Sequence, residues 1–239
     1  MLDFPTPVHA QIAQDAVDFF ADRLGVEAVL VIASCARGVA VPESDLDMVV
    51  LVDGSVDRTA FEGQWRSRQQ PITVHLDVVD GVYEPVVWDD GGGPDGFELE
   101  IGNHVAYSVA LWERDDALTV LRERWLPYYD DALRDARLAM VREACERDLA
   151  AVPFYAGREL YFQAFDRLYK AFREFLQALF ISRRTYPVAY DKWIRQQITE
   201  MLGEPDLYAK LPPILEIGDL TRDLPAKAET LTSLLNAWA

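Results

Sequence analysis

Three aspartates carry the chemistry that this sequence offers most clearly. Asp45 and Asp47 lie two residues apart at the start of an apolar run, Met48 to Val52. Because side chains alternate along a β-strand, both carboxylates point to the same side of it. Asp77 alternates in the same way with the apolar residues of a later run, 72–79. If these two strands are neighbours, the three carboxylates can gather as oxygen ligands of the kind that Mg²⁺ prefers.

A second chemical group lies just before the aspartate pair. The apolar run 28–33 ends at Ser34 and gives way to small residues, which predicts a tight turn opening a short helix. Backbone N–H groups and a hydroxyl in such a turn suit a phosphate. Arg37 follows, and it either orients phosphate or pairs with local acids. Cys35 is interpreted as a small buried residue rather than a nucleophile.

The elements that position these residues change character along the chain. The N-terminal half is mixed, with a helix over 6–24, strands over 28–33, 48–52 and 72–79, and a helix within 55–69. The alternation of Phe97 to Ile101 predicts a fourth strand, and Glu98 and Glu100 on it compete with Asp77 as the third acid. Residues 89–96 are rich in glycine and aspartate, which predicts a mobile turn or lid. His75 and His104 are interpreted as ordinary surface or hydrogen-bonded histidines.

From about residue 103 the apolar spacing is helical. It predicts helices over 130–149, 159–182, 189–202 and 224–238, with a break at Pro153. The sequence therefore predicts an α+β fold: a small mixed-sheet domain over residues 1–120, followed by a C-terminal helical bundle domain over residues 121–239.

The net charge and composition of the chain limit the classes of partner that it is expected to bind. The net charge of −17 opposes binding to long nucleic acid and favours cationic molecules, although it can also serve solubility alone. No apolar run is long enough for a membrane span, and the N-terminus lacks the pattern of a secretion signal. The two cysteines lie far apart in the sequence, so a reduced cytoplasmic protein is expected.

The motif over residues 28–79 resembles that of the DNA polymerase β-like nucleotidyltransferases. Their signature is Gly-Ser, a spacer, Asp-x-Asp opening a strand, and a third acid on a later strand. Ser34, the segment Ser44 to Asp47 and Asp77 match it. The match extends to Ala36-Arg37-Gly38, as in small bacterial and antibiotic-modifying members of the aminoglycoside or lincosamide nucleotidyltransferase type. Ala33 departs from the pattern, because it stands where the family has glycine.

The resemblance implies a metal-dependent transfer of AMP from ATP, or of another nucleoside monophosphate, onto a hydroxyl of a small, cationic acceptor. It assigns catalysis and Mg²⁺ binding to Asp45, Asp47 and Asp77. It also extends into the helical half, at Tyr186-Pro187 ahead of Asp191-Lys192-Trp193. By this resemblance, nucleotide binding falls to three residues: Ser34, Arg37 and Lys192. Two alternatives remain open, a protein-modifying minimal nucleotidyltransferase and a nucleotide-binding protein whose chemistry lapsed at Ala33. A homodimer also remains open.

Overall fold

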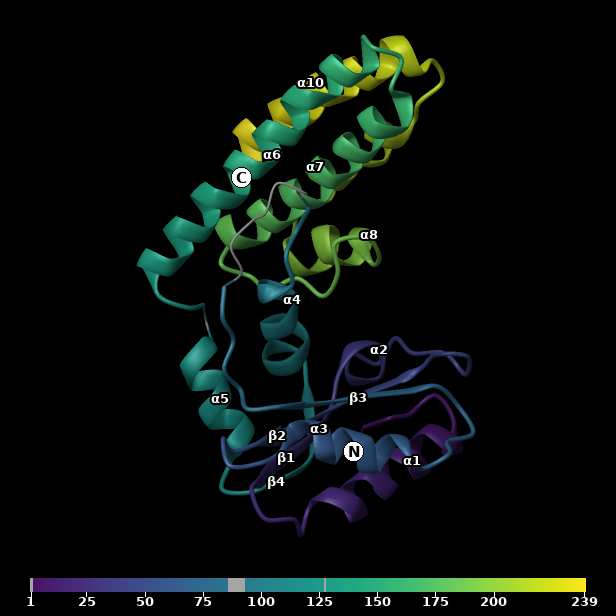
Figure 1. Cartoon of the computed structure of the whole chain (residues 1–239), viewed down its shortest axis with the longest axis vertical. Coiled ribbons are helices and arrows are strands. Elements are labelled where there is room, and N and C mark those ends of the chain that lie inside the picture. The colour runs from purple at the N-terminus through teal and green to yellow at the C-terminus, as the bar shows by residue number, and fades with distance from the viewer. Residues whose placement is uncertain (1, 86–92, 127) are drawn as a thin grey trace. The chain divides into compact units, whose positions relative to one another are not determined.

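The computed structural model describes residues 2–85, 93–126 and 128–239 (Figure 1). Its backbone divides into two compact units. The first comprises residues 1–84 and 100–126, and the second comprises residues 85–99 and 127–239. Each unit is described below by itself.

The first unit is built on a four-stranded mixed sheet with the order β3-β2-β1-β4. The strands are β1 (Val26–Val31), β2 (Leu46–Val52), β3 (Val74–Val79) and β4 (Val109–Glu113). β1 pairs antiparallel with both β2 and β4, whereas β2 and β3 are parallel. A parallel pair needs a crossover, and α3 (Arg58–Arg66) lies within the one between β2 and β3. The predicted mixed sheet is confirmed.

One face of this sheet forms the core of the first unit. The alternate residues Leu46, Met48 and Val50 of β2 are buried there. The apolar face of α1 (Pro7–Phe20), which includes Ile12 and Phe20, belongs to the same cluster. The other residues of each strand therefore point to the opposite face of the sheet.

Two predictions about the sheet are wrong. Phe97–Ile101 is not a strand but a short helix, α4, followed by the π-helix η1 (Gly102–Ala106). Phe97 and Ile101 are both buried and lie four residues apart, which is a helical spacing. A run of five residues fits both periods, so the pattern could not decide between them. The fourth strand is β4, in a region that we predicted to be helical, and each of its residues is half-buried.

After β4, α5 (Ala117–Trp125) completes the first unit. Trp125 donates its indole N–H to the carbonyl of Gly81 at 3.2 Å. This hydrogen bond joins α5 to the end of β3.

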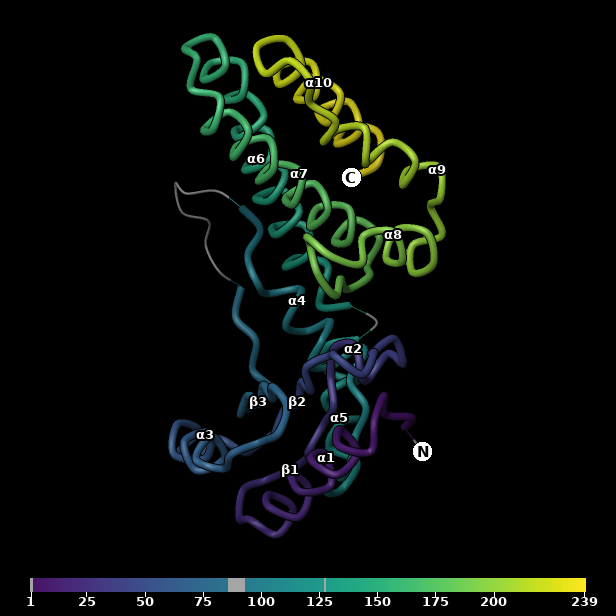
Figure 2. The backbone as a smooth tube through the Cα atoms, turned by 90° about the vertical axis from the view of Figure 1, so that its right-hand side faces the viewer, coloured from purple at the N-terminus to yellow at the C-terminus, as the bar shows by residue number. Residues whose placement is uncertain are grey.

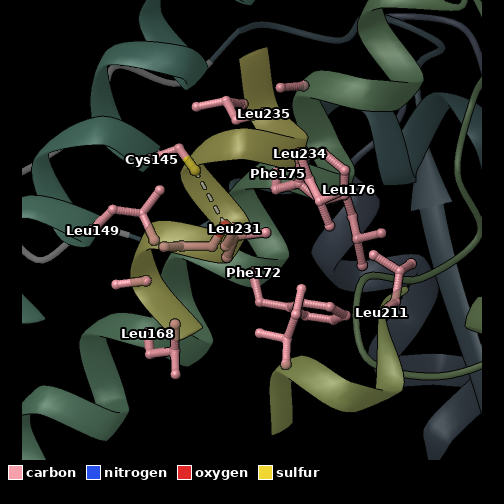
Figure 3. Close-up of a cluster of buried hydrophobic side chains, with 14 of the residues drawn as sticks. Cys145, Leu149, Leu168, Phe172, Phe175, Leu176, Leu211, Leu231, Leu234 and Leu235 are labelled. Atoms are coloured by element: carbon pink, nitrogen blue, oxygen red, sulfur yellow. Dashed lines mark hydrogen bonds between the residues drawn. The ribbon is translucent and has the colours of Figure 1, made fainter. Parts of the chain in front are cut away.

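The second unit is a bundle of three long helices, α6 (Asp131–Ala156), α7 (Tyr161–Ser182) and α10 (Leu220–Trp238), which lie side by side (Figure 2). Between α7 and α10 come the shorter elements α8 (Ile194–Gln196), η2 (Gln197–Met201), α9 (Pro205–Tyr208) and η3 (Pro212–Leu215). Figure 3 shows their core, in which Phe172, Phe175 and Leu231 are buried. The predicted helical bundle is confirmed.

The predicted break at Pro153 is wrong, because α6 continues to Ala156. Proline lacks an N–H, so it cannot donate to the carbonyl one turn earlier. Its own carbonyl accepts from the N–H of Gly157 at 3.0 Å, and this bond closes one further turn. The helix therefore ends at Gly157 rather than at the proline.

The division into units differs from the predicted one in two places. The first unit reaches residue 126, and residues 85–99 group with the helical unit. The reason is a buried arginine on α6, Arg137, which donates hydrogen bonds of 2.7 Å to Asp95 and Glu98. Of the predicted turn or lid over 89–96, residues 89–92 lie outside the described residues. Gly93 is anchored, because its N–H donates to Glu174 Oε1 at 2.6 Å.

Candidate active site

The aspartate pair lies at the start of β2. Leu46 and Met48 point into the core, so Asp45 and Asp47 lie on the opposite side of the sheet. The Asp45 side chain is 50% exposed, and Asp47 is half-buried. Both carboxylates are therefore placed on an uncovered part of the sheet face, as the sequence spacing predicted.

The parallel neighbour of β2 brings Asp77 to the same face. In the register of β2 and β3, Asp47 is opposite His75 and Val49 is opposite Asp77. Leu76 and Val78 of β3 are buried in the core, so Asp77 points away from it and is exposed. The predicted grouping of the three carboxylates depended on β3 being the neighbour of β2, and the two strands are neighbours.

His75 belongs to this group, although its sequence context was interpreted as that of an ordinary surface or hydrogen-bonded histidine. Its Nε2 lies 3.5 Å from Asp45 Oδ2, which is an ion pair when the imidazole is protonated. The signal was available, because His75 and Asp77 share one face of a strand by the same alternation that selected Asp77. The pairing with Asp45 came from the strand register, which the sequence did not give.

The predicted turn follows β1 and lies beside Asp47. The N–H of Ile32 donates to the carbonyl of Asp47 at 3.0 Å, and α2 (Ala33–Ala36) begins at the next residue. Ala33 has a φ of 53°, in the left-handed region that favours glycine. The turn therefore has the backbone conformation that a glycine at this position would supply.

The side chains of this turn are close to Asp47. Burial, and next the Asp47 carboxylate, raise the pKa of the Cys35 thiol, whereas a hydrogen bond with Ser34 lowers it. Cys35 is thus a protonated, buried thiol, as expected for a residue that is not a nucleophile. The Ser34 side chain is half-buried, and its hydrogen bond is with Cys35, the residue of the turn that interacts electrostatically with Asp47.

Arg37 folds back on the turn. Its Nε donates to the carbonyl of Ala33 at 3.2 Å. Burial lowers the pKa of its guanidinium, and the nearby Tyr107 raises it. These contacts place Arg37 so that it supports the turn after β1.

A second histidine faces Asp77. His104 lies on η1, and burial lowers its pKa while the Asp77 carboxylate raises it. The ring of Tyr83 lies 5.9 Å from the His104 ring, centroid to centroid. Neither His104 Nδ1 nor Tyr83 Oη has a hydrogen-bond partner among the described residues. No pattern in the sequence linked His104 to Asp77, because their proximity depends on η1, which was not predicted.

The acidic side chains of this site can serve as ligands of Mg²⁺ only as a pair. Within the described parts of the chain, no group of three or more His, Cys, Asp and Glu side chains is close enough to hold a metal ion. Mg²⁺ needs no such cage, because it is commonly held by one or two carboxylates together with waters and substrate phosphates. Asp45 and Asp47 provide two carboxylates of this kind beside the turn that carries Ser34. The residues present fit a magnesium ion that is completed by a triphosphate.

Comparison with known proteins supports the architecture. No protein-family model matches the chain, and no curated protein matches it. Among solved structures, it is similar to a nucleotidyltransferase-like protein from Exiguobacterium sibiricum 255-15, with a TM-score of 0.52 and 15% sequence identity. The similarity covers 95% of this chain and 74% of that one. The chain has a nucleotidyltransferase-like fold. No described helix is long and apolar enough to cross a membrane.

Within this nucleotidyltransferase-like fold, Glu98 and Glu100 are not on a strand. The Glu98 carboxylate is fully buried in the second unit and accepts hydrogen bonds from Arg137, Gln177 and Tyr129. Its hydrogen-bonding capacity is taken up by the protein itself. Glu100 is exposed on α4. Asp77 is therefore the one of the three candidate acids that a strand carries next to β2.

Lys192 lies in the second unit, two residues before α8, and it is exposed. Its carbonyl accepts a hydrogen bond from the Gln197 side chain at 3.1 Å. The backbone at this position is thus fixed by a buried glutamine. A contact of its ammonium with nucleotide stays a prediction.

Proposed function

We propose that this protein is a magnesium-dependent nucleotidyltransferase that moves a nucleoside monophosphate, AMP from ATP, onto a hydroxyl of a small molecule. One observation carries the proposal. Asp45, Asp47 and Asp77 project from the same face of neighbouring parallel strands, next to the turn that carries Ser34. The nucleotidyltransferase-like fold supports it.

The carboxylates have distinct roles in this proposal. Asp45 and Asp47 hold Mg²⁺, which neutralises charge on the triphosphate when it is bound. Asp77 takes the proton of the acceptor hydroxyl rather than serving as a third metal ligand, because the three carboxylates are not close enough together to hold one ion. The acceptor oxygen then forms a bond to the α-phosphorus, the bond from that phosphorus to the β-phosphate oxygen breaks, and pyrophosphate leaves.

Three further residues bind the nucleotide in this proposal. Ser34 donates its hydroxyl to a phosphate oxygen, and Arg37 keeps the turn in place through its hydrogen bond to Ala33. Lys192 supplies a cation for the triphosphate.

The left-handed φ of Ala33 favours an active enzyme over a nucleotide-binding protein that has lost its catalytic activity. The methyl group costs some strain, but the turn keeps the left-handed conformation and follows directly on the hydrogen bond between Ile32 and Asp47. Since the alanine has not displaced these groups, its presence alone does not remove the site.

The net charge of −17 favours a cationic molecule, such as an aminoglycoside-like one, over nucleic acid. The antibiotic-modifying resemblance points the same way.

The test is transfer from labelled ATP to a panel of aminoglycosides, lincosamides and neutral polyols, with and without Mg²⁺. Asp47→Asn should lower the rate about a thousandfold or more, because a metal ligand is lost in the transition state. Asp18→Asn is the matched control, since Asp18 is on α1, which packs on the other face of the sheet. Wild-type turnover by Asp47→Asn, or transfer that is independent of Mg²⁺, would contradict the proposal.

A further inference from the structure

A pocket of about 380 Å³ lies along the outer edge of β3, within the first unit. Its lining comes from the end of α3, the following connection and β3: Trp65, Arg66, Arg68, Gln69, Gln70, Ile72, Val74, His75, Leu76 and Asp77. This volume is at the lower end of the range for small-molecule sites, about 300–1,000 Å³. The pocket accommodates a metabolite-sized molecule rather than a polymer.

The strand edge contributes polar backbone groups to this pocket. β3 is the last strand of the sheet that the described residues form, so one side of it has no neighbouring strand among them. Val78 is on that side, because its N–H donates to Glu62 Oε1 at 3.4 Å instead of to a strand. Backbone direction alternates along a strand, so Val74 and Leu76 present their N–H and C=O groups to the same side. Both residues line the pocket.

The charged residues of the pocket differ in how they are paired. Arg66 forms an ion pair with Glu62 at 3.0 Å. The Arg68 guanidinium lies over the rings of Phe19, at 5.0 Å, and Trp65, at 5.7 Å. It has neither a hydrogen bond nor an ion pair with any residue that the structure describes. In a chain with 40 acidic residues, Arg68 is thus an exposed cation over aromatic rings, and no carboxylate in the described part of the chain neutralises it.

The same pocket reaches the candidate active site, since Asp77 is part of its lining. We propose that this pocket is the acceptor subsite, and that it takes a small hydroxyl-bearing molecule with an anionic group, a carboxylate or a phosphate ester. Arg68 binds the anionic group, and the acceptor hydroxyl lies toward Asp77. The subsite rests on the proposed function, whereas anion binding in the pocket does not.

This assignment differs from the cationic acceptor that the net charge favours. Net charge acts over the whole surface and governs encounter, whereas recognition depends on the groups within contact distance. Within the pocket those groups include the Arg68 guanidinium, whereas Arg66 is paired with Glu62. Guanidinium matches carboxylate and phosphate oxygens in a bidentate manner. The local charge therefore decides the class of ligand.

Four probes separate the charge of the ligand from its hydroxyls: glycerol, glycerate, glycerol 3-phosphate and 3-amino-1,2-propanediol. Each is titrated at fixed ionic strength into the ¹⁵N-labelled full chain, and the amide signals of Val74 to Asp77 are followed. Glycerate and glycerol 3-phosphate should give saturable shifts, and glycerol and the amine should not. Arg68→Ala should weaken binding of the anions about tenfold, as expected for loss of a charge-assisted contact. Arg158→Ala is the matched control, because Arg158 is an exposed arginine that also lies over an aromatic ring, Phe154.

Equal shifts with glycerol, stronger shifts with the amine, an absence of shifts, or unchanged binding in Arg68→Ala would each overturn the pocket assignment. The comparison of the four probes on the wild-type protein stands even if a variant misfolds. Mg²⁺-dependent ATP consumption is measured separately. Anion binding without ATP consumption would support the anion site and contradict the proposed function. ATP consumption without anion binding would support the proposed function and contradict the anion site.

Discussion

The N–H of Ile32 donates to the carbonyl of Asp47 at 3.0 Å, so the end of β1 is tied to the residue that carries the second carboxylate. The chain then turns at once and opens α2. It does so at Ala33, whose φ of 53° lies where side chains with a Cβ are strained. The strained residue therefore follows directly on the hydrogen bond that ties the end of β1 to Asp47.

Ala33→Gly should therefore keep the fold and stabilise it slightly. The left-handed conformation costs alanine about 1 kcal/mol, and glycine removes that cost but gains about 0.4–1 kcal/mol of unfolded-state entropy. We expect a change in the free energy of unfolding between zero and about 1 kcal/mol of stabilisation, measured by urea denaturation. Ala33→Val is the contrasting variant, and it should destabilise because β-branched residues avoid this region. A glycine variant that is clearly less stable than the wild type would show that the turn is not strained.

The strand chemistry of the site could be predicted from the sequence because alternation fixes which side chains share a face. The alternation of side chains alone predicted a face opposite the apolar residues for Asp45, Asp47 and Asp77, and the structure has them there. The register was out of reach, since it depends on pairing between segments that are far apart in the chain. This is why the contact of His75 with Asp45 was missed.

The errors have a common physical origin in short or polar segments. Phe97 to Ile101 is too short for its period to be decisive, and its helix is supported by Glu98, whose buried partner Arg137 lies 39 residues later. A buried arginine leaves no apolar pattern in the sequence, so nothing indicated that residues 93–99 would join the helical unit. Glu98 and Arg137 are both charged residues in the interior, and their burial depends on their pairing with each other.

The acids of the site should act as a unit. Asp77→Asn and Asp45→Asn should each lower magnesium-dependent transfer about a thousandfold, because they serve one bound triphosphate. The double variant should then be little worse than Asp45→Asn alone, as for residues that act on the same step. Single-turnover rates with labelled ATP give all three values. Fully multiplicative losses would mean that Asp77 acts independently of the metal, and a harmless Asp77→Asn would remove it from the site.

Lys192 offers a test of nucleotide binding in the helical unit. Lys192→Ala should weaken the affinity for ATP–Mg²⁺ by about 1–3 kcal/mol, the range for a charge-assisted hydrogen bond. The affinity is measured by calorimetry. Lys210→Ala is the control, because Lys210 lies in the same unit and over the ring of Trp238. If the two variants bind ATP equally well, Lys192 is an ordinary surface lysine.

A buried carboxyl in the helical unit couples stability to pH. Glu174 on α7 is fully buried, its Oε1 accepts from the N–H of Gly93, and its Oε2 has no hydrogen-bond partner among the described residues. Burial raises its pKa to about 7, from an ordinary value of 4.5. The Gly93 hydrogen bond and the guanidinium groups of Arg147 and Arg167 lower it, and the nearby Asp148 raises it. Asp148 is itself paired with Arg167 at 2.6 Å.

Glu174→Gln should remove a pH dependence that the wild type shows between about pH 4.5 and 7. In that window the folded protein holds a proton on Glu174 that the unfolded chain has released, so stability falls as pH rises toward the folded pKa. Glutamine stays neutral and still offers an oxygen to the Gly93 N–H, so the variant should gain about 1–3 kcal/mol over the wild type between pH 5 and pH 8. The free energy of unfolding of both proteins is measured by urea denaturation at each pH. The difference between the two proteins removes the contribution of the other titrating groups, which they share. An equal pH dependence in the two proteins would show that Glu174 is ionised in the fold at all these pH values.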